Sequence, residues 1–179
     1  MIIGVTGKAG SGKSEATAIL KAHLQANVID LDKIGHQLLM DPQVINEIEA
    51  TFGTDVIQGN VVDRKKLGAI VFSESHSLES LNSIMHPRIK SEVEKRLDES
   101  QKTVLIDGAL LHEIGLIECC DEIILIESDE ADIAKYAGES KRKIAHLQRS
   151  LEDYQSQATH IIKNTYDREA FRKSLAGLY

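Results

Sequence analysis

The chain has 179 residues, a length typical of one globular domain. Hydrophobic residues make up 42% and charged residues 27%, which excludes a disordered chain. The net charge of −7 argues against a protein that binds nucleic acid or an anionic membrane through a basic face, and we expect neither partner. The apolar runs are too short to cross a bilayer and no signal-peptide pattern opens the chain, so we expect a cytoplasmic protein.

The start of the chain alternates short apolar runs with helical patterns. Ile2–Val5 is predicted to be a strand, and the glycine-rich stretch Gly7–Gly12 a turn. Apolar residues at helical spacing predict a helix over 13–25. A second strand is expected at Asn27–Asp30, followed by a helical pattern up to Met40. This order is typical of an α/β fold.

The middle of the chain has only helical patterns. Residues 42–100 are predicted to form helices with breaks at Gly53, Gly59 and Pro87, where the proline is expected to begin a new helix. The stretch is too long for a plain crossover between neighbouring strands. We therefore interpret residues 33–100 as a helical insertion on the substrate side.

The last part returns to alternation. Strands that alternate with helices predict a parallel sheet covered by helices on both faces, with right-handed crossovers. The chain is expected to form one domain, with a core of residues 1–32, 101–127 and 157–179 and a short lid of residues 128–150. The remaining elements expected are strands over 103–107, 122–127 and 159–163 and helices over 109–118, 129–156 and 167–176.

A complete phosphate-binding motif follows the first predicted strand. The pattern G-x-x-x-x-G-K-[ST] lies between a strand and a helix, which is the context that it requires. Its glycines let backbone N–H groups turn toward phosphate oxygens, and the helix N-terminus adds partial positive charge. The motif predicts a three-layer P-loop NTPase fold around a five-stranded parallel sheet, with ATP bound by Gly7, Lys8, Ala9, Gly10, Ser11, Gly12, Lys13 and Ser14.

Three side chains of the motif have individual roles. The Lys13 ammonium is expected to reach the β- and γ-phosphates, and the Ser14 hydroxyl is expected to bind Mg²⁺. Lys8 is a further cation in the loop. It contacts phosphate or, as is more common for a surface lysine, stays solvated.

Three predicted strands end in an acidic residue: Asp30, Asp107 and Glu127. The apolar run that ends at Asp107 has the form of a Walker-B strand, so Asp107 is predicted to be the acid on the Mg²⁺ side. An aspartate between a strand and a helix is equally suited to cap the helix. Asp32 could accept the proton of an acceptor hydroxyl, but its residue type alone favours helix capping.

Two other patterns fail. His112 and Glu113 begin like a zinc-binding helix motif, but Leu116 stands where the second histidine is required. Asn164–Asp167 is similar to the guanine-reading N-K-x-D motif but lacks the lysine, which disfavours a GTPase. The only two cysteines are adjacent and imply neither a disulfide framework nor a zinc site.

Short segments in order along almost the whole chain resemble the dephospho-CoA kinase family. Val28–Ile34 resembles the family's D-x-D segment, and Leu81–Ile89 resembles its L-x-x-I-x-H-P-x-I signature. Asp107–Glu113 is similar to D-x-P-L-L-x-E, with alanine in place of the proline. The stretch from Gln148 to Asn164 resembles Q…A-D-x-x-I-x-N, with threonine in place of the aspartate.

The resemblance implies an enzyme that uses ATP and Mg²⁺ to phosphorylate the ribose 3′-hydroxyl of dephospho-CoA, giving CoA and ADP. The sequence indicates no obligate protein partner. The resemblance implies that Asp32 is the base for that hydroxyl, in place of a helix cap. Arg64, His86 and Leu110 would lie toward the CoA-side substrate, and Asn164 near the adenine of ATP.

The expected lid departs from the family, whose arginine-rich Q-x-x-R-L-x-x-R stretch is absent here. Arg142 is the first candidate to face the transferred phosphoryl group, with Arg149, Lys141 and Lys143 as alternatives; a solvated charged helix face is the other interpretation. Because of this departure, a kinase of another small metabolite or nucleotide, and a homologue that binds ATP without catalysis, stay open beside the dephospho-CoA kinase.

Overall fold

The computed structural model describes residues 1–73, 75–136 and 148–179. It divides into two compact units, one formed by Met1–Asp30 with Leu97–Tyr179 and the other by Leu31–Arg96. The expected boundaries of core, insertion and lid stay a prediction. In the described parts of the chain, no helix is long and apolar enough to span a membrane.

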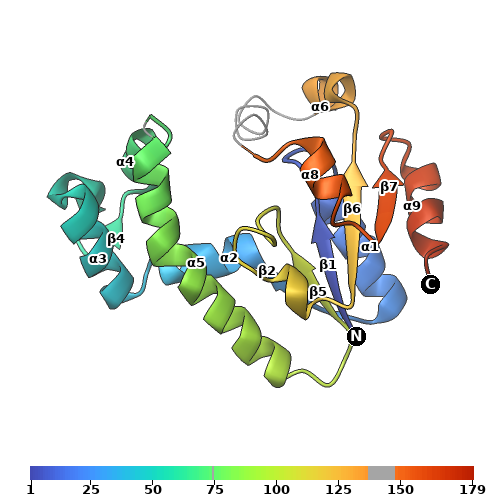
Figure 1. The fold of residues 1–179 in the computed structure, drawn as a ribbon, viewed down its shortest axis with the longest axis horizontal. Coiled ribbons are helices and arrows are strands. Elements are labelled where there is room, and N and C mark those ends of the chain that lie inside the picture. The colour runs from blue at the N-terminus through green and yellow to red at the C-terminus, as the bar shows by residue number, and fades with distance from the viewer. Residues whose placement is uncertain (74, 137–147) are drawn as a thin grey trace. The chain divides into compact units, whose positions relative to one another are not determined.

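The first unit is built on a five-stranded sheet in the order β2-β5-β1-β6-β7 (Figure 1). Every neighbouring pair of strands is parallel, as the sequence predicted. The central strands are apolar along their length because both of their faces are covered. The strands are β1 Ile2–Thr6, β2 Asn27–Asp30, β5 Val104–Asp107, β6 Glu122–Glu127 and β7 His160–Lys163.

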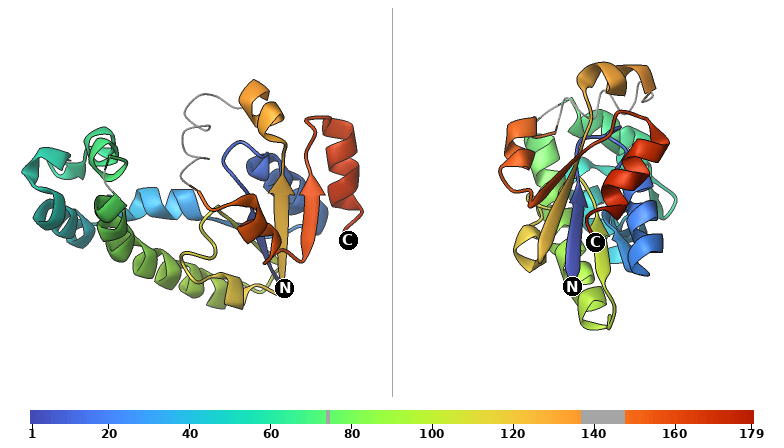
Figure 2. Two further views of the ribbon diagram at one scale, coloured as in Figure 1. Left: turned by 45° about the horizontal axis from the view of Figure 1, so that its top comes forward. Right: turned by 90° about the vertical axis from the view of Figure 1, so that its right-hand side faces the viewer.

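Helices complete the layers of this unit. α1 (Lys13–Leu24) and α9 (Arg168–Ala176) pack against each other on one face of the sheet, and α8 (Leu151–Gln155) lies on the other (Figure 2). The core between β1, β6, α1 and α9 is aliphatic apart from Phe171, in keeping with an aromatic content of 4%. A further helix, α6 (Glu130–Tyr136), follows β6.

The second unit is mainly helical. Asp41 and Asp63 accept hydrogen bonds from backbone N–H groups at the starts of α3 and α4, so side chains define both helix ends. Its elements are α2 Leu31–Leu38, α3 Pro42–Phe52, η1 Thr54–Val56, β3 Ile57–Gln58, β4 Val61–Val62, α4 Arg64–Val71 and α5 Ser75–Asp98.

The structure adds a hairpin that the sequence analysis missed. β3 and β4 pair antiparallel, with Ile57 opposite Val62, and leave a loop of Gly59 and Asn60. Gly59 has φ +63°, which glycine adopts without strain. A Gly-Asn pair between short apolar runs is a hairpin signal, so the sequence contained the information.

The predicted helix break at Pro87 is wrong, because α5 continues through it. Proline removes one helical donor and crowds the preceding turn. The helix is held on both sides of this defect by the burial of Ile84 and Ile89. Arg88 adds two contacts: its guanidinium donates to the Ile84 carbonyl at 2.8 Å and to the carboxylate of Glu47 in α3.

The predicted helix over 109–118 is also wrong. The chain forms turns over 111–115 and then a short 3₁₀ helix, η2 (Ile117–Cys119). Gly115 has φ +74°, a conformation that ends a right-handed helix. The thiols of Cys119 and Cys120 both donate to the Leu116 carbonyl, which closes this segment before β6.

Candidate phosphate-binding site

The loop between β1 and α1 has a backbone that only glycine allows at its key positions. Gly7, Gly10 and Gly12 have φ values of +142°, +90° and +101°. A Cβ atom at Gly7 would lie 2.2 Å from the Ile126 carbonyl oxygen, and one at Gly12 would lie 2.3 Å from the side-chain nitrogen of Asn164. The loop therefore needs glycine for two reasons: only glycine adopts these φ values without strain, and only glycine leaves room for the neighbouring atoms.

The loop leads into a helix N-terminus without a side-chain cap. The N-cap residue of α1 is Gly12, which has no side chain to cap the helix, and a helix N-terminus of this kind favours an anion. Lys13 is the first residue of the helix, and its Nζ lies 3.5 Å from the Lys8 carbonyl oxygen, back over the loop. Ser14 follows in the same turn and is exposed.

Side chains from distant parts of the chain hold the other side of the loop. The Ser11 carbonyl accepts from Asn164 Nδ2 at 2.9 Å, and the Ser128 hydroxyl lies between two carbonyl oxygens, 3.1 Å from that of Ser11 and 2.9 Å from that of Asn164. The C=O and N–H of a trans peptide point in opposite directions, so fixing the Ser11 carbonyl turns the N–H of Gly12 away from these side chains. Asn164 is only 2% exposed, and its contact with adenine stays a prediction.

Two acidic side chains lie at neighbouring strand ends beside this loop. Asp30 ends β2 and Asp107 ends β5, and the two residues are paired in the register. Asp107 is also the register partner of Val5, next to the start of the loop. No α-helix begins after Asp107 within residues 108–129, so the helix-capping alternative for Asp107 is wrong.

The third strand-end acid, Glu127, has a different surrounding. Gln155 of α8 donates to its carboxylate at 3.0 Å, and Lys163 is its register partner. Lys8 lines a small pocket together with Glu127 and Glu130, and its contact with phosphate stays a prediction.

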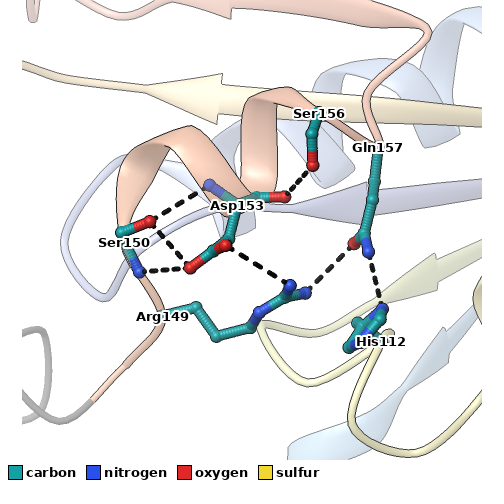
Figure 3. A network of polar contacts seen from close by, with 6 residues as sticks. All are labelled: His112, Arg149, Ser150, Asp153, Ser156 and Gln157. Atoms are coloured by element: carbon teal, nitrogen blue, oxygen red, sulfur yellow. Dashed lines mark hydrogen bonds and ion pairs between the residues drawn. The ribbon is translucent and has the colours of Figure 1, made fainter.

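A polar network fixes the start of α8 (Figure 3). Ser150 and Asp153 form a reciprocal capping box, and the hydrogen bond from Ser150 lowers the pKa of the Asp153 carboxyl. Arg149 donates to Gln157 Oε1 at 3.1 Å and lies 3.8 Å from Asp153. Because Gln157 Oε1 points to Arg149, the amide nitrogen of Gln157 points to His112 Nδ1, 2.6 Å away. The amide nitrogen donates, so Nδ1 is the acceptor and the imidazole carries its hydrogen on Nε2.

This network bears on the predicted lid cations. Arg149, which precedes α8, is held by Asp153 and Gln157, while Lys141, Arg142 and Lys143 lie outside the described residues. Arg142 therefore stays a prediction.

Two further contacts to the phosphate loop, like those of Ser128 and Asn164 with Ser11, were not predicted from the sequence. Gln148 Oε1 accepts from the Ala9 N–H at 2.8 Å, and the Tyr166 hydroxyl donates to the Gly10 carbonyl at 2.6 Å. Each joins residues more than a hundred positions apart, so no local pattern could predict them. Gln148 was visible only as one letter of the family resemblance.

The remaining predicted residues lie in separate parts of the chain. Leu110 follows β5 in the first unit and is 38% exposed. In the second unit, Asp32 is the second residue of α2, Arg64 the first residue of α4, and His86 is half-buried in α5. Because Asp32 lies inside the helix rather than before it, it does not occupy the N-cap position.

The loop and its surroundings fit a nucleotide triphosphate with Mg²⁺ chemically. Ser14 supplies a hydroxyl and Asp107 a carboxylate, which are the hard oxygen ligands that Mg²⁺ prefers. Among the described residues, no group of three or more His, Cys, Asp or Glu side chains gathers in the manner of a metal site. Mg²⁺ does not need such a group, since it keeps several waters and takes the rest from phosphates.

The parallel sheet, the glycine torsions and the uncapped helix after the loop define a P-loop nucleotide-binding protein. The family model of dephospho-CoA kinase matches residues 1–169, and the chain belongs to that family, whose members are kinases and use ATP. The resemblance seen in the sequence is thus confirmed.

Individual relatives agree over nearly full length. The dephospho-CoA kinase of Fusobacterium nucleatum is 35% identical over 98% of this chain and 95% of its own length. The solved dephospho-CoA kinase of Campylobacter jejuni is 26% identical with a TM-score of 0.73, covering 99% of this chain and 94% of that one. A Thermus thermophilus crystal structure reaches a TM-score of 0.82 at 25% identity, covering 99% and 95%.

Proposed function

We propose that this protein transfers the γ-phosphoryl group of ATP to the ribose 3′-hydroxyl of dephospho-CoA, giving CoA and ADP. The observation that carries the proposal is the formed phosphate loop with an uncapped helix behind it, in a chain of the dephospho-CoA kinase family. We place the reaction in the cytoplasm and expect no obligate protein partner.

The phosphate loop binds the nucleotide in this proposal. The backbone N–H groups at the start of α1 face the β-phosphate, and the Lys13 ammonium neutralises charge on the β- and γ-phosphates. The Lys8 ammonium adds long-range electrostatic attraction for the nucleotide phosphates. Asn164 fixes the loop through Ser11 and lies toward the adenine.

Ser14 and Asp107 are the residues proposed to hold Mg²⁺. When bound, the ion would neutralise charge on the phosphate oxygens as the γ-phosphoryl group leaves ADP. Asp107 suits this role because it ends β5 in register with Val5, directly before the loop.

Asp32 is the proposed base. The 3′-oxygen of dephospho-CoA attacks the γ-phosphorus, its proton passes to the Asp32 carboxylate, and the bond to the β,γ-bridging oxygen breaks to release ADP. Asp32 stands in the first turn of α2, two residues after the end of β2. Arg64 and His86 are proposed to contact the CoA-side substrate from α4 and α5, and Leu110 from the loop after β5.

Arg142 is the proposed cation that faces the transferred phosphoryl group. Charge on that group spreads over its oxygens in the transition state, so a positive group adds rate there. Arg149 is a weaker candidate because Asp153 and Gln157 already hold its guanidinium.

An ADP-release assay with a panel of acceptors tests the function. Dephospho-CoA is expected to give ADP and CoA one for one, while other hydroxylic metabolites and nucleotides give far less. If another acceptor is preferred, the substrate assignment is wrong; if ATP binds but no acceptor gives ADP, the chain is a non-catalytic homologue.

The base is tested by Asp32→Asn, which keeps the shape of the side chain. We expect kcat to fall by about 10²–10⁴-fold with little change in ATP affinity. Asp41→Asn is the matched control, because Asp41 caps α3 in the same unit and asparagine caps equally well. Turnover of Asp32→Asn at the level of this control would reject Asp32 as the base.

A further inference from the structure

Tyr166 holds a backbone conformation that is unusual for its residue type. Its φ is +63°, and a bulky side chain in this left-handed region is strained. Two hydrogen bonds keep it there: its N–H donates to Asn164 Oδ1 at 2.9 Å, and its hydroxyl donates to the Gly10 carbonyl at 2.6 Å. The strain is therefore coupled to a contact with the phosphate loop.

The Gly10 carbonyl belongs to the tight turn at the tip of that loop. The Ser11 N–H donates to the Lys8 carbonyl at 3.1 Å, and Gly10 has φ +90° at the third position of the turn, as type II turns require. The Gly10 C=O and the Ser11 N–H share one peptide plane. Holding the carbonyl on Tyr166 therefore keeps the N–H directed at Lys8 and the turn closed.

The next peptide is fixed from the same segment. Asn164 donates to the Ser11 carbonyl, so two successive carbonyls of the loop are bound by residues 164 and 166 of the link between β7 and α9. The left-handed turn at Tyr166 is what brings its ring back toward the loop beside Asn164. Both carbonyls are thereby drawn to one side, which leaves the opposite side of the loop to ligand.

We propose that Tyr166 is a positioning residue for the phosphates of the nucleotide, acting through its hydroxyl on the Gly10 carbonyl. It keeps the phosphate loop in its binding conformation before the nucleotide arrives, so that binding costs less ordering of the loop. The proposal rests on the proposed function, because it takes the loop to be the ATP site.

The test removes only the hydroxyl, with Tyr166→Phe. The matched control is Tyr179→Phe, since the Tyr179 hydroxyl donates to Glu122 at the start of β6, the opposite end of that strand from the loop. ATP and inorganic pyrophosphate binding are measured by calorimetry on the full chain, together with KM, kcat and thermal unfolding.

We expect Tyr166→Phe to weaken ATP and pyrophosphate binding about three- to tenfold and to raise KM for ATP equally. The value of kcat should change less than twofold, because the loop binds the ground state and the transition state alike. Tyr179→Phe should leave ATP binding, pyrophosphate binding, KM and kcat unchanged.

Equal ATP affinity in wild type, Tyr166→Phe and Tyr179→Phe would overturn the positioning role. A fall in thermal stability of Tyr166→Phe with unchanged affinity would do the same, because the hydroxyl would then be only structural. A wild-type protein that binds neither ATP nor pyrophosphate would instead refute the proposed function, and the role of Tyr166 with it.

Discussion

Two loops leave the same edge of the central sheet and are built in opposite ways. The phosphate loop after β1 is held by side chains from remote segments, namely Ser128, Gln148, Asn164 and Tyr166. The loop after β5 is held largely by its own turns over residues 108–116, with hydrogen bonds such as Leu116 N–H to the Leu111 carbonyl at 2.8 Å. A loop that must offer its N–H groups to a ligand needs its carbonyls bound elsewhere, and Ser128, Asn164 and Tyr166 meet that need, while Gln148 accepts from the Ala9 N–H.

The largest expected effect is a fall in kcat on substitution of Lys13, the residue that follows the phosphate loop. Lys13→Ala should lower kcat by about 10²–10³-fold or more, because it removes the charge that faces the transferred phosphate. The fold should survive, so thermal unfolding should be close to that of wild type. Lys21→Ala, an exposed lysine of the same helix, is the control. Near wild-type turnover in Lys13→Ala would contradict its assignment.

The second prediction breaks the contact between the loop and its remote supports. Gly12→Ala places a methyl group 2.3 Å from Asn164 and forces alanine into φ +101°. We expect a loss of about 2–4 kcal/mol of unfolding free energy together with at least tenfold weaker ATP binding.

Gly59→Ala measures the torsional cost of alanine at positive φ without a steric clash. Gly59 has φ +63° and open space around it, so alanine there carries the torsional cost alone, about 1–2 kcal/mol. Denaturant unfolding of both variants measures the difference. If the two lose the same stability, the close approach of Asn164 to the loop does not matter.

The third prediction concerns the loop after β5. The hydroxyl of Tyr154 in α8 donates to the Ala109 carbonyl at 3.0 Å, and burial raises the pKa of Tyr154 to about 12. Tyr154→Phe should lower stability by about 1–2 kcal/mol, because the partly buried carbonyl loses its donor. ATP affinity should be unchanged, since the phosphate loop has its own supports. A marked loss of ATP affinity would show that the two loops are not independent.

The smallest expected effect is on the pH dependence of stability and comes from Cys120, where the loop after β5 joins β6. Burial raises the pKa of the Cys120 thiol to about 12, so in the folded protein it stays protonated under conditions where the unfolded chain ionises. Above pH 9 the unfolded state therefore binds fewer protons, and stability falls as pH rises toward 12. Between pH 8 and pH 10 the loss from this group is about 1 kcal/mol.

Cys120→Ala tests this pH dependence. Unfolding of wild type and variant is measured in denaturant at pH 8 and pH 10, and the variant should lose about 1 kcal/mol less over that interval. An identical loss in both proteins would mean that the thiol does not contribute.

The two loops also differ in what the sequence could predict. The phosphate loop, the strands around it and the acids at their ends follow from local patterns: a complete motif, short apolar runs, and Asp30, Asp107 and Glu127 directly after them. The loop after β5 was misread as a helix, because its apolar spacing is helical and only Gly115 signals the interruption. The spacing of apolar residues indicates which side chains are buried, but it does not determine whether the backbone that carries them is helical or a series of turns.

The supports of the phosphate loop could not be predicted for a different reason. The contacts of Gln148 and Tyr166 depend on how strands pair over more than a hundred residues, which one sequence does not encode locally. Asn164 was singled out by resemblance and assigned to adenine, while the structure adds a contact with Ser11 that the resemblance did not contain. Pro87 shows the same limit, since burial on both sides overrides a residue that usually ends helices.

Ser128 and Gln148 contact one short stretch of the phosphate loop from two different segments of the chain. The Ser128 hydroxyl lies 3.1 Å from the Ser11 carbonyl oxygen, and Gln148 Oε1 accepts from the Ala9 N–H at 2.8 Å. The three residues from Ala9 to Ser11 therefore take their conformation from partners that are twenty positions apart in the sequence. A substitution at either partner changes the loop without altering any residue of the phosphate-binding motif itself.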